Sequence, residues 1–134
     1  MSMAPKILII EDEPSLLKAM EEALLVHDFQ VATAVDAGRG MEQVQEFKPD
    51  LILLDIILPG KNGFEILKEL KSSPEYAKIP VIIMSNLGDE EEINQSMSLG
   101  AADYLVKAEY DLNEIVNRIK KYLPQSHAGI QKQD

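Results

Sequence analysis

The stretch Leu51-Ile52-Leu53-Leu54-Asp55-Ile56-Ile57-Leu58-Pro59-Gly60 decides the fold of this chain. Its first four residues are all apolar, and so short an apolar run is typical of a strand buried on both faces of a parallel sheet. Pro59 and Gly60 end the extended segment, because proline cannot donate to a strand ladder and glycine favours a turn. Asp55 therefore stands at the carboxyl end of a buried strand, where open α/β sheets place their ligand sites.

Apolar strands alternate with amphipathic helices on both sides of this stretch. The predicted strands are residues 6–10, 29–34, 51–54, 81–84 and 104–106. Between them, apolar residues recur three or four positions apart, as they do on one face of a helix. This alternation predicts an α/β fold: a doubly wound, five-stranded parallel sheet with helices on both faces.

One of these helices is expected between Asp89, which can cap its first turn, and Gly100, which can end it. Ile93 and Met97 are four residues apart and are expected to face the core. The acidic run Asp89-Glu90-Glu91-Glu92 is best explained as the start of this helix, because acidic side chains favour helix amino termini. We assign it no role in a reaction.

The composition predicts a single acidic domain. The chain has 134 residues, 46% of them hydrophobic, a net charge of −10 and no cysteine. We expect residues 5–124 to form one domain and residues 125–134 a polar tail or linker stub. The negative charge argues against direct binding of nucleic acid or an anionic membrane, and the lack of cysteine excludes disulfides and thiolate chemistry. No stretch resembles a membrane span or signal peptide, so a cytoplasmic location is expected.

Polar residues stand at the carboxyl ends of four predicted strands. They are Glu11 and Asp12 after the first strand, Asp55 after the third, Ser85 after the fourth and Lys107 after the fifth. Because parallel strands share one direction, these side chains are expected to meet at one edge of the sheet. Three converging carboxylates repel one another unless a cation lies among them, and oxygen ligands without histidine or cysteine suit Mg²⁺. The hydroxyl and ammonium groups can contact a phosphoryl group held on a carboxylate nucleophile.

Four blocks of this sequence resemble those of the receiver domain of two-component response regulators. They are Glu11-Asp12, Leu53–Gly63, Met84-Ser85-Asn86 and Gly100–Lys107, and the resemblance extends over residues 6–123. It implies the flavodoxin-like strand order 2-1-3-4-5. It also implies that Asp55 accepts a phosphoryl group from a phosphohistidine on a sensor histidine kinase or phosphotransfer protein.

The resemblance implies a role for each residue around Asp55. Mg²⁺ is bound by Asp12, by Asp55 and by the backbone carbonyl of Ile57, while Glu11 acts mostly through water. On the other side, Ser85 and Lys107 contact the phosphoryl group.

The resemblance also implies a switch and a barrier to water. Tyr104 is the aromatic residue whose rotation reports the phosphorylated state, after Ser85 has moved toward the phosphoryl group. Ile57 and Leu87 lie beside the approach of a hydrolytic water, and their apolar side chains are expected to slow the loss of phosphate. The helix of residues 89–99, the fifth strand and the helix of residues 112–123 form the expected output surface. There a downstream protein, an output domain or a second copy would bind, so we expect a monomer or a phosphorylation-promoted dimer.

Two departures from the family pattern are Asn86, where a small residue is favoured, and Ala108, where proline usually follows the lysine. A cis bond before alanine costs about 2.5–4 kcal/mol, so the Lys107–Ala108 peptide is predicted to be trans.

Two other function classes remain open. Phosphatases and phosphotransferases with an aspartate nucleophile carry a second carboxylate two residues later, where Ile57 stands here. We therefore expect no enzyme activity beyond the phosphorylation and dephosphorylation of the chain itself. A degenerate receiver acting as a phosphorylation-independent binding scaffold would be expected to lose a carboxylate or the lysine.

Overall fold

Five parallel strands form the centre of the structure. The computed structural model describes residues 4–86 and 88–123. The strands are β1 (Lys6–Ile10), β2 (Gln30–Ala34), β3 (Leu51–Asp55), β4 (Val81–Ser85) and β5 (Asp103–Val106). They lie in the order β2-β1-β3-β4-β5, as predicted. The predicted strands are all present, with bounds shifted by about one residue at most.

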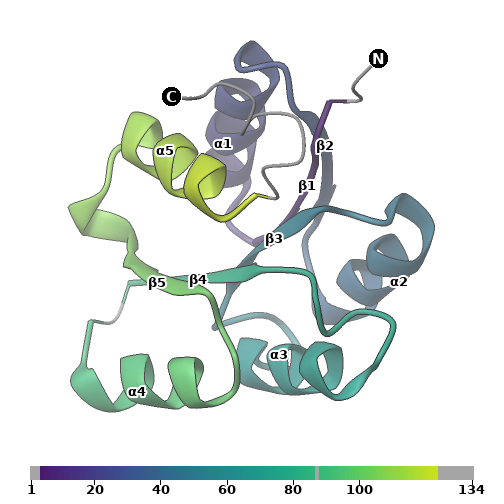
Figure 1. Cartoon of the computed structure of the whole chain (residues 1–134). Coiled ribbons are helices and arrows are strands. Elements are labelled where there is room, and N and C mark those ends of the chain that lie inside the picture. Colours follow the sequence, from purple (N-terminus) through teal and green to yellow (C-terminus); the bar gives the residue numbers. More distant parts are fainter. Residues whose placement is uncertain (1–3, 87, 124–134) are drawn as a thin grey trace, which may run out of the picture.

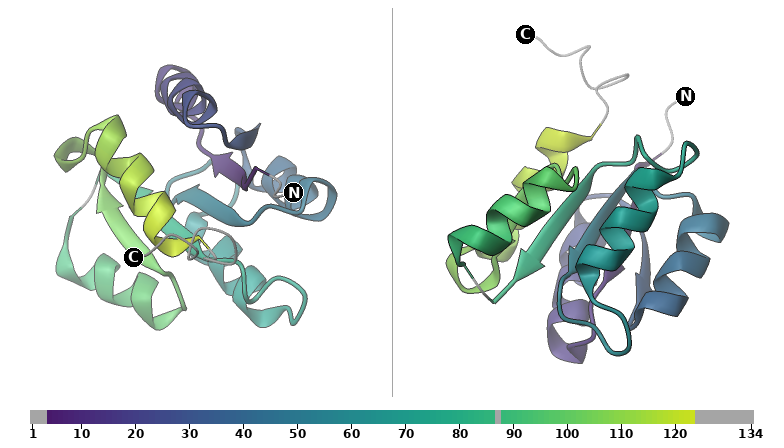
Figure 2. Two further views of the ribbon diagram at one scale, coloured as in Figure 1. Left: turned by 45° about the horizontal axis from the view of Figure 1, so that its top comes forward. Right: turned by 90° about the horizontal axis from the view of Figure 1, so that it is seen from below.

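Five α-helices cover the two faces of this sheet (Figure 1). They are α1 (Pro14–Val26), α2 (Ala37–Phe47), α3 (Gly63–Ser72), α4 (Glu90–Ser98) and α5 (Leu112–Tyr122). Helices α1 and α5 lie on one face and α2, α3 and α4 on the other, and Figure 2 shows both layers from two further directions. Within the described ranges, no helix is long and apolar enough to cross a membrane.

Each face of the sheet has its own apolar core. Successive strand residues point to opposite faces, so Ile9 and Leu53 pack in the cluster under α1 and α5, while Ile10 and Leu54 pack in the other cluster. All four are fully buried. The central strand is thus covered on both sides, which confirms the interpretation of its unbroken apolar run.

Helix α4 differs from its prediction in one respect. Its cap is as expected, because the Asp89 side chain accepts a hydrogen bond from the N–H of Glu92. Met97, however, is 46% exposed and Ser96 is fully buried, so the prediction that Met97 faces the core is wrong. The inward stripe runs from Ile93 through Ser96 to Leu99, three residues apart each time.

The chain leaves β5 through a short 3₁₀ helix, η1 (Lys107–Glu109). The peptide bond between Lys107 and Ala108 is trans, as predicted. The predicted tail of residues 125–134 lies outside the described residues.

Candidate functional site

The parallel register brings the predicted side chains to one edge of the sheet. Ile10 pairs with Leu54, and Asp55 pairs with Met84. The residues that follow these strands therefore emerge side by side, although they lie tens of positions apart in the sequence. At the end of β4, Ser85 pairs with Val106, directly before Lys107.

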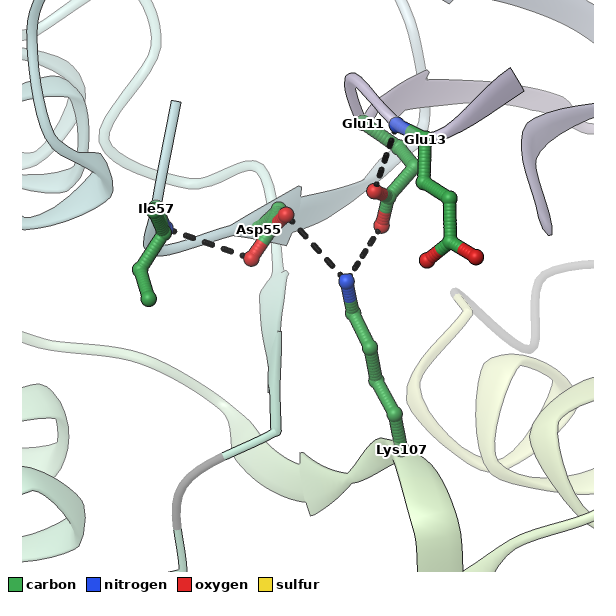
Figure 3. Close-up of polar contacts among 5 residues, drawn as sticks. All are labelled: Glu11, Glu13, Asp55, Ile57 and Lys107. Carbon is green, nitrogen blue, oxygen red and sulfur yellow. Dashed lines mark hydrogen bonds and ion pairs between the residues drawn. The ribbon is translucent and has the colours of Figure 1, made fainter. Parts of the chain in front are cut away.

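Lys107 joins the two buried carboxylates at this edge (Figure 3). Its Nζ atom lies 2.8 Å from Oε1 of Glu11 and 3.2 Å from Oδ2 of Asp55. The side chains of Glu11 and Asp55 are 0% and 6% exposed, and that of Lys107 only 12%. One ammonium group therefore faces two carboxylates in a region with little access to water.

The remaining carboxylate oxygens are held by the backbone. The N–H of Ile57 donates to Oδ1 of Asp55 over 3.2 Å, and the N–H of Glu13 donates to Oε2 of Glu11 over 3.0 Å.

Behind Asp55, Gly63 packs so closely that an added Cβ would lie 2.6 Å from the Asp55 carbonyl oxygen. The start of α3 is thus pressed directly against the end of β3.

The pKa values of these side chains reflect their burial and the closeness of the two carboxylates. Burial and the charge of Glu11 raise the pKa of Asp55 to about 6, against the opposing effects of Lys107 and the Ile57 N–H. Burial by itself would lower the pKa of Lys107, but the close ion pair with Glu11 and the charge of Asp55 outweigh burial and raise that pKa above its ordinary value. A further cation would relieve the repulsion between the carboxylates.

Three carboxylates could supply that cation with ligands. Glu11, Asp12 and Asp55 each offer one oxygen, and these atoms all lie within 4.8 Å of one another. Asp12 is exposed, whereas Oε1 of Glu11 is buried and has the ion pair with Lys107 but no well-directed hydrogen bond. Carboxylate oxygens beside a solvent-facing position fit a hard divalent ion such as Mg²⁺, which keeps several waters.

Ser85 and Tyr104 lie together on the α4 side of this edge. Ser85 is fully buried and Tyr104 is 8% exposed. Burial raises the pKa of Tyr104 to about 12, a hydrogen bond with Ser85 opposes that rise, and a hydrogen bond with Glu92 adds to it. The predicted switch pair is therefore in direct contact.

Glu92 is the residue of this region that sequence reasoning missed. Its Oε1 atom accepts a hydrogen bond from the Tyr104 hydroxyl over 2.9 Å. Glu92 belongs to a run of four acidic residues, and the preference of acidic side chains for a helix amino terminus explains each of them equally well. Ser96, one turn later, occupies the inward stripe of α4, but only the packing of the helix reveals this.

The two predicted water-gating residues differ in what the structure describes. The N–H of Ile57 lies beside the Asp55 carboxylate and the residue is 59% exposed, and its effect on hydrolysis stays a prediction. Leu87 lies outside the described residues.

Comparisons with known proteins point to one family. The family model for the response regulator receiver domain matches residues 7–120. The chain is 37% identical over 122 residues to sporulation initiation phosphotransferase F of Bacillus subtilis, covering 91% of this chain and 96% of that protein. It is 35% identical over 121 residues to the phosphate regulon transcriptional regulatory protein PhoB of Rhizobium meliloti, covering 90% of this chain but only 53% of that regulator.

Solved structures show the same architecture. The Mn²⁺-bound form of response regulator Rcp1 superimposes with a TM-score of 0.78 at 30% sequence identity. The match covers 90% of this chain and 99% of that structure.

Proposed function

The chain belongs to the family of response regulator receiver domains, and we propose that it accepts a phosphoryl group on Asp55 within a two-component phosphorelay. The observation that carries this proposal is the placement of Asp55 beside Lys107 and within reach of Glu11 and Asp12. These groups supply a nucleophile, a cation for the phosphoryl oxygens and ligands for a metal ion.

In the proposed reaction, a carboxylate oxygen of Asp55 forms a bond to phosphorus as the bond from phosphorus to a histidine nitrogen breaks. The electron pair of the broken bond stays on the leaving imidazole. With a pKa of about 6, Asp55 is mostly ionised at pH 7 and can act as the nucleophile. Lys107 already contacts Oδ2 of Asp55, so its ammonium group lies where phosphoryl oxygens would arrive.

Asp12 and Asp55 would hold Mg²⁺ directly, with the backbone carbonyl of Ile57 as a further ligand and Glu11 acting through water. The ion would neutralise part of the charge on the phosphoryl oxygens. The carboxylate cluster supports this assignment, as does the similarity to a receiver described in a Mn²⁺-bound form.

The donor in this proposal is a sensor histidine kinase or a phosphotransfer protein, in a cytoplasmic setting. The phosphoryl group ends on the chain's own aspartate, so the chain is not an enzyme acting on other substrates. The output is a downstream protein, an attached output domain or a second copy, bound at the surface of α4, β5 and α5. No specific observation favours the scaffold alternative, because none of the groups needed for phosphorylation is lost.

Acetyl phosphate tests the proposal without a known kinase. With Mg²⁺, wild-type protein should gain the mass of one phosphoryl group, and chelation of the metal should abolish the gain. Asp55→Asn should remain unlabelled, whereas Asp36→Asn, which removes a helix-capping aspartate far from the acceptor in sequence, should be labelled as wild type. Equal labelling of wild type and Asp55→Asn would refute the acceptor assignment.

A further inference from the structure

The first turns of three helices share one sequence pattern, a capping Asn or Asp followed three residues later by Glu. The pairs are Asn62 with Glu65 in α3, Asp89 with Glu92 in α4, and Asp111 with Glu114 in α5. In such a capping box the cap side chain accepts the N–H of the Glu, and the Glu carboxylate accepts the N–H of the cap residue. Both hydrogen bonds are formed in α3 and α5, at 2.9–3.2 Å.

In α4 the first of these hydrogen bonds is formed, but the carboxylate of the glutamate accepts a hydrogen bond from a different donor. The N–H of Glu92 donates to Asp89 over 2.7 Å. The carboxylate of Glu92 accepts the hydroxyl proton of Tyr104 over 2.9 Å, and Tyr104 comes from β5. This glutamate therefore ties the start of α4 to the neighbouring strand, at the position where its counterparts complete a cap.

Breaking the hydrogen bond between Tyr104 and Glu92 would destabilise the fold. Tyr104 is 8% exposed, and a buried hydroxyl that loses its partner costs about 1–3 kcal/mol. A carboxylate is a stronger acceptor than a neutral oxygen. The Tyr104 hydroxyl also has a hydrogen bond with Ser85, so Ser85, Tyr104 and Glu92 form one continuous polar chain from the phosphorylation site to α4.

We propose that Glu92 is a positioning residue, which holds Tyr104 against α4 and passes a change at Ser85 to the first turn of that helix. This inference rests on the proposed function and adds a residue to it. The Glu92 carboxylate accepts from the Tyr104 hydroxyl, whereas in a capping box it would accept from the Asp89 N–H. Because linked hydrogen bonds strengthen one another, a movement of Ser85 toward a phosphoryl group alters the bond from Tyr104 to Glu92. The first turn of α4, which carries Glu92, then changes its conformation.

The test compares single and double variants with wild type in the presence of Mg²⁺, with and without beryllofluoride as a phosphoryl mimic. Glu92→Ala removes the acceptor, Glu92→Gln keeps an acceptor oxygen, and Glu65→Ala removes the corresponding glutamate of α3. The readout is amide hydrogen exchange and NMR shifts of residues 89–98 and of the Tyr104 ring. Labelling of Asp55 by acetyl phosphate is measured in every variant.

Glu92→Ala should be labelled as wild type but lose at least half of the response in α4. Glu92→Gln should retain most of it, and Glu65→Ala should respond fully although it loses a helix cap. Tyr104→Phe should lose at least as much of the α4 response as Glu92→Ala, because it removes the hydrogen bonds to both Ser85 and Glu92. Adding Glu92→Ala to Tyr104→Phe should change nothing further, because the bond between these two residues is already lost.

An α4 response in Glu92→Ala as large as that of wild type would overturn the inference, and so would an additive double variant. If Glu92→Ala fails to fold, Tyr104→Phe and Glu92→Gln still decide the matter, since a full response in Tyr104→Phe overturns it as well. Failure of wild type to be labelled at all would instead overturn the proposed function.

Discussion

The ammonium nitrogen of Lys107 lies 3.2 Å from Oδ2 of Asp55, although β4 separates β3, which ends at Asp55, from β5, which Lys107 follows. Lys107 thus reaches across the end of one strand to the next. The same nitrogen lies 2.8 Å from Glu11, so a single cation compensates two buried anions. The stability of the metal-free protein should depend on this arrangement.

Replacing Lys107 by methionine should destabilise the metal-free protein at pH 7. It leaves Glu11 and Asp55 buried without their ammonium partner, and the loss of one partner of a buried ion pair costs about 3 kcal/mol or more. The loss should shrink as the pH falls, because Asp55 without Lys107 takes up a proton more readily. Urea unfolding with a chelator at pH 7 and pH 5 measures this. Lys61→Met, which breaks an ion pair with Glu69 whose side chains are 40% and 48% exposed, should have a much smaller effect.

Asp55→Asn should stabilise the metal-free protein at pH 7. The pKa of Asp55 is raised by burial from 3.8 to about 6, so the folded state binds its proton more tightly than the unfolded state does. The stability gained from that proton is complete below about pH 4 and is lost as the pH rises through about 6. Keeping Asp55 ionised at pH 7 therefore costs up to about 3 kcal/mol, which the asparagine variant avoids.

Unfolding curves at several pH values, with chelator present, check this second prediction. The advantage of Asp55→Asn over wild type should decline as the pH falls from 7 to 4. Glu22→Gln, an exposed change on α1, controls for the general loss of a negative charge. An advantage that stayed constant over this range would show that Asp55 titrates normally. Addition of Mg²⁺ should stabilise wild type more than Asp55→Asn.

Much of the fold could be predicted because local signals agree with the tertiary structure. Four consecutive apolar residues in β3 require cover on both faces, and Asp89 forms its predicted capping hydrogen bond. The meeting of Asp55 with Lys107 followed from strand direction alone. Features of this kind depend on residues within one element, or on the topology of the sheet.

The features that could not be predicted from the sequence depend on how a helix is rotated about its own axis against the sheet. Ile93 is compatible with a stripe through Met97 or through Ser96, and only packing against β5 selects the second. The role of Glu92 follows from that rotation, since the carboxylate meets Tyr104 only when this side of α4 faces the strand. Likewise, nothing in the sequence showed that Lys107 would contact Glu11 as well as Asp55.

Gly63→Ala should destabilise the protein severely. The new Cβ would lie 2.6 Å from the carbonyl oxygen of Asp55 and 2.7 Å from the Cα of Ile56, and both are backbone atoms that cannot rotate away. Such overpacking typically costs 1–3 kcal/mol, and here about 2 kcal/mol or more is expected. Gly38→Ala is the matched control in α2, where the nearest atom would be 3.7 Å away and alanine should stabilise the helix. Thermal melting of both variants distinguishes the opposite signs.

Ser85→Ala should separate phosphorylation from its conformational consequence. Asp55, Lys107 and the carboxylates remain in place, so acetyl phosphate should still label the protein. The hydrogen bond between Ser85 and Tyr104 is lost, and the response of residues 103–106 to beryllofluoride should be weaker. NMR shifts of these residues provide the measurement. A response equal to that of wild type would mean that the signal leaves the site by another route.

Ile57 should slow the hydrolysis of the phosphorylated protein. Its N–H donates to the Asp55 carboxylate, and this apolar residue is 59% exposed. Its side chain offers no hydrogen bond to orient an attacking water, and we expect it to keep water from the acyl phosphate. Ile57→Asn supplies a polar group at the same position and should shorten the half-life of the phosphorylated protein several-fold. Val35→Asn, a change of the same kind at an exposed valine directly after β2, should leave the half-life unaltered. The half-life is followed by intact-protein mass spectrometry after removal of acetyl phosphate, and equal decay of Ile57→Asn and wild type would mean that another group limits the access of water.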